Sequence, residues 1–181
     1  MMIVGSFLSV FLLVAPPIPK VDRECETSKS VVPEGYAFDT KGPQRGSFVL
    51  SLALPASARS GEPIVAAMKL ESLDAHPVQL LADERPWGAE YEFQITDVAS
   101  GEQLVERKDR LRTITTISRE LVSRSCPAYQ VSTLTTRYVL GAGTYTVRAF
   151  RVPTEVTDIS VPTTRKLPEV VSNAVILTVM P

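Results

Sequence analysis

The chain has 181 residues, of which 44% are hydrophobic and 22% charged, and its formal net charge is −1. This composition fits one globular domain with tails and excludes wholesale disorder. The near-neutral charge argues against nucleic acid as a partner, because phosphate binding needs a net basic surface.

The chain begins with an apolar run over residues 3–15. At about 1.5 Å per helical residue, this run is shorter than a hydrocarbon core of about 30 Å. It therefore fits the apolar region of a secretory signal better than a membrane-spanning helix. We expect residues 1–19 to be a signal peptide, or else an uncleaved N-terminal anchor. Either would place the protein outside the cytoplasm, in the periplasm, the cell envelope or the extracellular space.

An irregular arm is expected over residues 20–46, which are polar, contain prolines and glycines and show no sustained hydrophobic period. The folded domain would then cover residues 47–181. The two cysteines, Cys25 and Cys126, permit one disulfide in an exported protein, and the alternative is two free thiols. Neither has a metal-ligand spacing or a nearby histidine, so no metal site is expected.

From residue 47 onward the sequence predicts short strands separated by turns. In the clearest one, at 90–96, Tyr91, Phe93 and Ile95 alternate with polar residues, which is the period of a half-buried strand. The other predicted strands lie at 48–54, 64–73, 78–81 as a short edge piece, 103–107, 131–140, 143–149 and 172–180. Residues 112–126 fit either a pair of strands or a short helix at 117–122.

Strands with one apolar face form antiparallel sheets that must bury these faces against each other. Parallel βαβ units are not expected, because no apolar repeat of helix length separates the strands. The sequence therefore predicts an all-β fold: an antiparallel β-sandwich of about seven strands, preceded by the apolar leader and the irregular arm.

Three stretches resemble the immunoglobulin-like sandwich modules of bacterial exported proteins. Residues 60–64 (SGEPI) resemble the turn that opens their second strand, and residues 97–101 (DVASG) resemble the hairpin after their third. Residues 140–145 (LGAGTY) with 172–175 (SNAV) resemble their last two strands. The resemblance implies an immunoglobulin-like β-sandwich in which the Tyr145 ring is buried and its hydroxyl bonds to nearby backbone. Such modules mostly bind, space or support other domains.

Residue types suited to catalysis are sparse. His76 is the one histidine of the chain and precedes Pro77 in a turn-like tetrapeptide, with no GxSxG motif, so we interpret it as a solvated turn residue. Glu90 and Glu92 lie about 6.6 Å apart along a strand. A glycosidase pair can have this separation, but the solvent-facing side of an amphipathic strand is the simpler interpretation. We therefore expect no enzyme, no cofactor and no metal.

Two regions are candidate contact surfaces. The first is the loop that holds Trp87, which either stacks on a ligand or closes one end of the sandwich. The second follows from charge: residues 62–106 contain ten acids and two bases, and residues 107–137 contain seven bases and two acids. The two blocks either neutralise each other or leave a basic partner-binding surface. The contact residues of that surface would be Arg110, Arg112 and Arg119.

The sequence thus predicts a non-catalytic exported module with an interaction or structural role in the cell envelope. Its partner would be another protein or an envelope component, with membrane contact through an uncleaved N-terminus alone. One alternative is a secreted proteinase-inhibitor-like module that uses the insert at 108–128. The other is a carbohydrate-binding or carbohydrate-active protein that uses Trp87 with Glu90 and Glu92. Tyr145, Tyr91 and Phe93 are expected to be structural.

Overall fold

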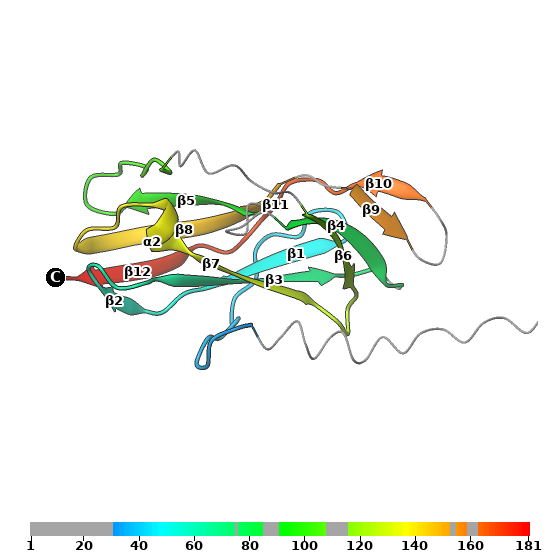
Figure 1. The fold of residues 1–181 in the computed structure, drawn as a ribbon, viewed down its shortest axis with the longest axis horizontal. Helices are drawn as coiled ribbons and strands as arrows, with labels where there is room; N and C mark the ends of the chain where they lie inside the picture. The colour runs from blue at the N-terminus through cyan, green and yellow to red at the C-terminus, as the bar shows by residue number, and fades with distance from the viewer. Residues whose placement is uncertain (1–30, 75, 85–90, 108–115, 153–154, 159–162) are drawn as a thin grey trace, which may run out of the picture.

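The computed structural model describes residues 31–181 except 75, 85–90, 108–115, 153–154 and 159–162. The leader at 1–19 and Cys25 lie outside the described residues. In chain order the elements are β1 (Phe48–Ala53), β2 (Ser57–Arg59), β3 (Val65–Ser72), β4 (Val78–Glu84), β5 (Tyr91–Asp97), β6 (Thr116–Val122), β7 (Ala128–Thr133), α2 (Leu134–Arg137), β8 (Gly143–Arg151), β9 (Glu155–Asp158), β10 (Thr164–Lys166), β11 (Val170–Val171) and β12 (Val175–Met180) (Figure 1). Within the described residues, no helix is long and apolar enough to cross a membrane.

Eight of the described strands form the two sheets of an immunoglobulin-like sandwich. One sheet has the order β1-β3-β7. In the other, β8 pairs with β5 along one edge and with β12 along the opposite edge, where β11 also pairs with it and β2 then joins β12. The β12–β2 pair is parallel, and the other pairs of the two sheets are antiparallel. The predicted all-β sandwich is therefore confirmed.

Alternating side chains of these strands fill the space between the sheets. In β5, Tyr91, Phe93 and Ile95 are at most 6% exposed, as their period predicts. Phe93 pairs with Ala149 and Ile95 with Val147 of β8, so the inward faces of neighbouring strands coincide. Each fully buried aliphatic or aromatic side chain contributes about 1.5–3 kcal/mol relative to an exposed one.

A third sheet, which the sequence does not predict, closes one end of the sandwich (Figure 1). Its order is β10-β9-β4-β6, and its strands come from three connections of the sandwich: β3 to β5, β5 to β7, and β8 to β11. We call it the end sheet. Four of its apolar side chains in the described part of the chain are fully buried and extend the sandwich core: Val78, Leu80, Val122 and Val156.

The end sheet changes two expectations for its segments. The stretch predicted as a short edge piece at 78–81 is β4, which runs to Glu84 and pairs with β6 on one side and β9 on the other, so it is central. The ambiguous stretch at 112–126 contains β6, so the strand alternative holds over 116–122 and the helix is wrong. The edge assignment of 78–81 was wrong, and 112–126 fitted two structures, because strand pairing depends on partners far away in the sequence.

The strand predicted at 131–140 is wrong beyond Thr133. Leu134 begins the single helical turn α2, and the Tyr138 N–H donates to the Leu134 carbonyl at 2.8 Å. Both side chains are at most 2% exposed. A spacing of four residues places side chains on one face of a helix and also on one face of a strand. The apolar pattern was therefore compatible with either structure.

The strand predicted at 103–107, in the hairpin after β5, is reduced to its first residues. A single bridge joins Thr96 to Gln103, and Leu104 donates its N–H to the Ile95 carbonyl at 2.8 Å. Arg107 instead donates its N–H to the carbonyl of Arg137 at 2.7 Å. The chain therefore leaves the edge of β5 and turns toward α2.

The described part of the arm packs against the β1-β3-β7 sheet. Tyr36 donates its hydroxyl to the Val65 carbonyl at 2.8 Å, and the Phe38 ring lies 5.8 Å from the Tyr129 ring. Every residue of β1 is buried, so this strand is covered on both faces. The arm is irregular in secondary structure, yet its side chains are part of the packing.

Asn173 joins the two sandwich sheets at the edge of β1. Its Oδ1 accepts the Leu52 N–H at 2.8 Å, and its Nδ2 donates to the Leu52 carbonyl at 3.1 Å and to Thr40 Oγ1 at 2.8 Å. The carboxamide therefore bonds to both backbone groups of Leu52, as a neighbouring strand would. Gly42 lies close by, where a Cβ would be 2.2 Å from the Val171 carbonyl oxygen, so no larger residue fits.

The turn between β6 and β7 contains Cys126, which is buried and disulfide-bonded. Its N–H donates to Ser123 Oγ at 3.0 Å, and its carbonyl accepts the Ser123 N–H at 2.9 Å. The predicted pairing with Cys25 stays a prediction, because Cys25 lies outside the described residues.

Candidate functional site

The end sheet brings the attachment points of the two predicted contact regions together. Glu84, the last residue of β4, pairs with Thr116, the first residue of β6. Residues 85–90 follow Glu84 in the chain, and residues 108–115 precede Thr116. By chain continuity, both regions therefore join the sheet at the same end of the β4–β6 pair.

Most of the predicted contact residues cannot be placed. Trp87, Arg110 and Arg112 lie outside the described residues. Arg119 belongs to β6, where its Cα pairs with that of Leu81 in β4. Their role in binding therefore stays a prediction.

Polar contacts hold the end sheet against the sandwich. Arg165 of β10 forms an ion pair with Asp74, which follows β3, and its guanidinium carbon lies 5.9 Å from the centre of the Phe48 ring. Arg124 donates from Nη2 to the Leu73 carbonyl at 3.3 Å. Together with the buried apolar side chains, these contacts give the end sheet a defined position on the sandwich.

The described part of the end sheet offers a hydrophilic surface at its β9 and β10 side. All three residues of β10 are exposed. Thr164 pairs with Thr157, which pairs with Gln79 of β4, and Lys166 pairs with Glu155. This row of hydroxyl, amide and charged groups suits hydrogen-bonded contact with a polar partner.

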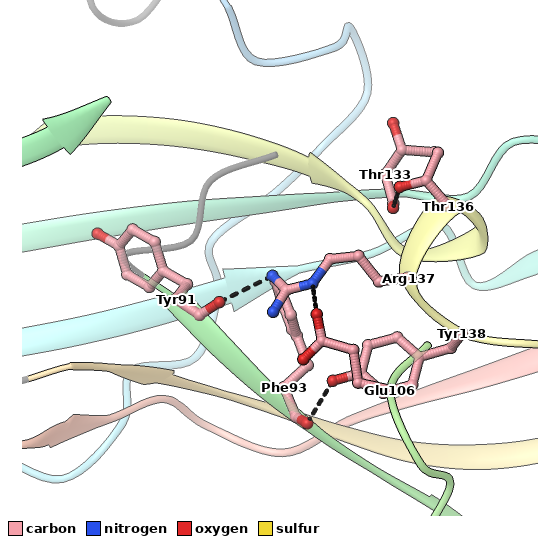
Figure 2. A network of polar contacts seen from close by, with 7 residues as sticks. All are labelled: Tyr91, Phe93, Glu106, Thr133, Thr136, Arg137 and Tyr138. Atoms are coloured by element: carbon pink, nitrogen blue, oxygen red, sulfur yellow. Dashed lines mark hydrogen bonds and ion pairs between the residues drawn. The ribbon is translucent and has the colours of Figure 1, made fainter. Parts of the chain in front are cut away.

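A second polar network lies at the outer edge of β5 (Figure 2). The Arg137 side chain donates from Nε to Glu106 Oε1 at 2.6 Å and from Nη1 to the Tyr91 carbonyl at 2.8 Å. Its guanidinium carbon lies 5.2 Å from the centre of the Phe93 ring. Tyr138 donates its hydroxyl to the Phe93 carbonyl at 2.9 Å. Arg137 and Tyr138 thus bond to consecutive outward carbonyls of one strand.

These bonds, with two from the hairpin, close the edge of β5. Leu104 donates its N–H to the Ile95 carbonyl, and Gly101 donates its N–H to the Asp97 carbonyl. The outward carbonyls of residues 91, 93, 95 and 97 therefore all accept hydrogen bonds. A closed edge does not recruit a further strand.

The network also affects the acidity of Tyr138. Burial raises the pKa of its hydroxyl to about 12, and the negative charges of Glu106 and Glu92 add to the rise, whereas the positive charge of Arg137 opposes it. At neutral pH this hydroxyl is therefore protonated and can only donate to the Phe93 carbonyl.

Two shallow depressions flank β5. The larger, of about 400 Å³, combines apolar and polar side chains: Glu92, Phe93, Gln103, Leu104, Val105, Glu106 and Tyr138. The smaller, of about 220 Å³, lies on the outer face of the sheet and is polar: Gln94, Thr96, Thr146 and Arg148. The larger one has two carboxylates beside exposed apolar surface, since Val105 is 82% exposed.

Groups suited to catalysis are sparse among the described residues. His76 is exposed in the turn after β3, and no group of three or more His, Cys, Asp or Glu side chains within the described ranges could hold a metal ion. Glu92 is exposed and lines the larger depression, but Glu90 and Trp87 lie outside the described residues. The carbohydrate alternative therefore stays a prediction.

The sequence does not single out Arg137, which is one of the seven bases of residues 107–137. In a strand that turns Leu134 and Tyr138 inward, Arg137 would point toward solvent. In the structure, Arg137 is 9% exposed.

Tyr145, by contrast, is 5% exposed and donates its hydroxyl to the Gly141 carbonyl at 3.0 Å.

No protein-family model and no curated protein matches the sequence. Among solved structures, the chain is similar to the cohesin module of a family 33 glycoside hydrolase from Clostridium perfringens, with a TM-score of 0.28 and 9% identity. The match covers 72% of this chain and 95% of that one. A likeness at this level carries no argument about function.

Proposed function

We propose that the protein is a non-catalytic, exported interaction module of the cell envelope, and that the end sheet is its main contact region. The observation that carries this proposal is the assembly of three sandwich connections into one hydrogen-bonded sheet at one end of the molecule. Immunoglobulin-like sandwiches group their connections at their two ends, and such loops on a rigid scaffold are common sites of recognition.

The way the end sheet is built supports recognition by a preformed surface. Its inward side chains belong to the common core, and the Asp74–Arg165 ion pair fixes it laterally. A surface held in this way loses little conformational freedom on binding, so more of the contact energy remains as affinity. Because the described outer residues are hydroxyl, amide and charged groups, the partner is a protein or an envelope component with a polar surface.

Export has independent support from the chain. The apolar run at 3–15 has the length of a secretory signal. Cys126 is disulfide-bonded, and disulfides persist in oxidising compartments.

The proteinase-inhibitor alternative has less support than the interaction module. Residues 116–122 of its insert form β6, which pairs with β4 along seven positions. An inhibitory loop entering a protease cleft would therefore have to come from residues 108–115. Neither alternative has an observation that favours it over the interaction module.

A co-purification experiment tests the proposal. The full-length tagged protein is expressed in its own cells, and proteins that co-purify from envelope fractions are quantified. We compare it with the double variant Thr164→Glu/Lys166→Glu in β10. Because both residues are exposed, the fold should be kept, at a cost of up to about 1 kcal/mol for the two carboxylates that Lys166→Glu places opposite each other at Glu155. The recovery of the specific partner should fall about tenfold or more, as when central contacts of an interface are lost.

The matched control is Thr178→Glu/Arg148→Glu on the outer face of the sandwich, which makes the same change in charge at two exposed positions. It should recover the partner as the wild type does. If the control loses the partner and the β10 variant retains it, the contact region lies on the sandwich and the proposal is wrong.

A further inference from the structure

The larger depression is lined by residues of β5, of the hairpin that follows it and by Tyr138, which directly follows α2. In the ribbon, α2 lies at the opposite end of the molecule from β9 and β10 (Figure 1). We propose that this depression binds the arginine side chain of a partner protein. This site is separate from the end sheet and would add a second, charge-specific contact to the module.

A guanidinium group lies directly behind the wall of the depression, against two residues that line it. Arg137 of the same chain places its guanidinium over the Phe93 ring and bonds to Glu106 Oε1 (Figure 2). Planar guanidinium groups combine ring stacking with forked hydrogen bonds to carboxylates, which an ammonium group does less well. The same surroundings extend outward, where Glu92 and Gln103 line the depression.

Charge complementarity favours a cation as the occupant. The side chain of Glu106 is 43% exposed although it pairs with Arg137, and Glu92 is exposed. Both carboxylates line the same depression, together with the Tyr138 side chain. Among the described residues that line the depression, the two carboxylates are the charged groups, and Arg137 pairs with one of them from behind.

The apolar part of the depression suits the stem of an arginine. Val105 is 82% exposed and Leu104 is partly buried, and both line the depression next to Glu106. Arginine side chains place their methylene groups along apolar surface while the charged head stays at a polar rim. A purely polar cation such as a hydrated metal ion would leave this apolar surface unused.

The closed edge of β5 preforms the site. Because Arg137 and Tyr138 occupy the carbonyls of Tyr91 and Phe93, a partner cannot add a strand there and must use side chains. The bond of Tyr138 holds its ring against β5, and a further bond from Arg137 Nε holds Glu106, so these two walls have partners within the protein.

Methyl NMR of the whole protein tests the proposal. The probe is acetyl-arginine N-methylamide, and the matched control probe is acetyl-citrulline N-methylamide, which has nearly the same shape but no charge. We expect saturable shifts of the Leu104 and Val105 methyl signals with the arginine probe, at a dissociation constant on the order of 1 mM. The citrulline probe should shift them little.

Two exposed glutamates of the same hairpin region provide matched variants. Glu92→Gln should weaken binding of the arginine probe roughly three- to fivefold, the effect of losing one exposed ion pair. Glu102→Gln should leave binding unchanged, because Glu102 does not line the depression. Equal shifts with citrulline, equal effects of the two variants, or an absence of shifts at the Leu104 and Val105 methyls would overturn the proposal. Equally tight binding of a lysine probe would overturn the assignment to a guanidinium.

This test is separable from that of the proposed function. The Thr164→Glu/Lys166→Glu variant should still bind the arginine probe, because β10 lies at the other end of the molecule. If the probe fails to bind while that variant still loses its envelope partner, this inference is wrong and the proposed function stands.

Discussion

The sandwich sheets and the end sheet both bury apolar side chains, but their sequences are organised differently. In β5 and β8, inward residues recur at every second position of one continuous stretch. In the end sheet, the residues whose full burial the structure describes come from three separate connections, and Val78 pairs with Val122 across more than forty residues of chain. A continuous strand is thus specified locally, whereas the end sheet exists only when the sandwich brings its pieces together. We expect the sandwich to act as the scaffold and the end sheet as the part adapted to a partner.

The largest effect is expected in the sandwich core. Met68 of β3 is fully buried, so Met68→Ala should lower the free energy of unfolding by about 3 kcal/mol through lost burial and a cavity. Urea denaturation measures this. Because β3 is the central strand of its sheet, amide exchange should accelerate throughout the sandwich and the end sheet. Acceleration confined to β3 would show that the sandwich does not unfold as one unit.

Removal of the contact that joins the sandwich sheets should have the next largest effect. Asn173→Ala leaves both backbone groups of Leu52 without their side-chain partner, so we expect a loss of about 2 kcal/mol in unfolding free energy. Thr40→Ala serves as the control, since it removes one exposed bond to the same side chain and should cost clearly less. Equal losses for both variants would mean that the Leu52 bonds contribute little.

A smaller and local effect is expected in the end sheet. Val156→Ala removes two methyl groups from its buried side and should cost about 1.5 kcal/mol. Hydrogen exchange followed by mass spectrometry should then accelerate in β4, β6, β9 and β10 while the sandwich strands keep wild-type rates. Uniform acceleration across the molecule would contradict the distinction between scaffold and end sheet.

The smallest effect concerns alkaline pH and the edge of β5. The pKa of Tyr138 is about 12 in the folded protein against 10.0 for an ordinary tyrosine. Between these values the unfolded chain loses the proton while the folded one retains it, so stability falls as pH rises through this window. Tyr138→Phe should reduce this decline at the expense of about 1 kcal/mol at neutral pH, from the lost bond to Phe93. An unchanged alkaline decline in urea midpoints would show that Tyr138 does not titrate in this way.

The local hydrophobic pattern was sufficient to predict the sandwich strands and insufficient to predict the other elements. Tyr91, Phe93 and Ile95 could be assigned to one face because alternation over seven residues has a single structural solution. Leu134 and Tyr138 could not, because a separation of four residues satisfies both a strand and a helical turn. The packing of the arm could not be predicted for another reason. Tyr36 and Phe38 pack as single side chains from an irregular backbone, so the sequence shows no hydrophobic period there.

The candidate sites were less accessible to sequence reasoning than the fold. The opposite charges of residues 62–106 and 107–137 allowed either mutual pairing or a basic surface. Glu106 and Arg137 do pair across the two blocks, but no sequence rule identifies this pair among the many combinations. The end sheet could not be foreseen because β4 and β9 pair across more than seventy residues, and pairing at that distance is decided by the assembled sandwich.

Site-specific photo-crosslinking in living cells tests the central claim most directly. A photoreactive amino acid replaces Thr157 in β9 of the end sheet or Thr146 in β8 of the sandwich; both are half-buried threonines on strands flanked by neighbours. The account predicts a specific crosslinked envelope partner from position 157 and none of comparable yield from position 146. Crosslinking of that partner from position 146 alone, or equally from both, would contradict the assignment of recognition to the end sheet.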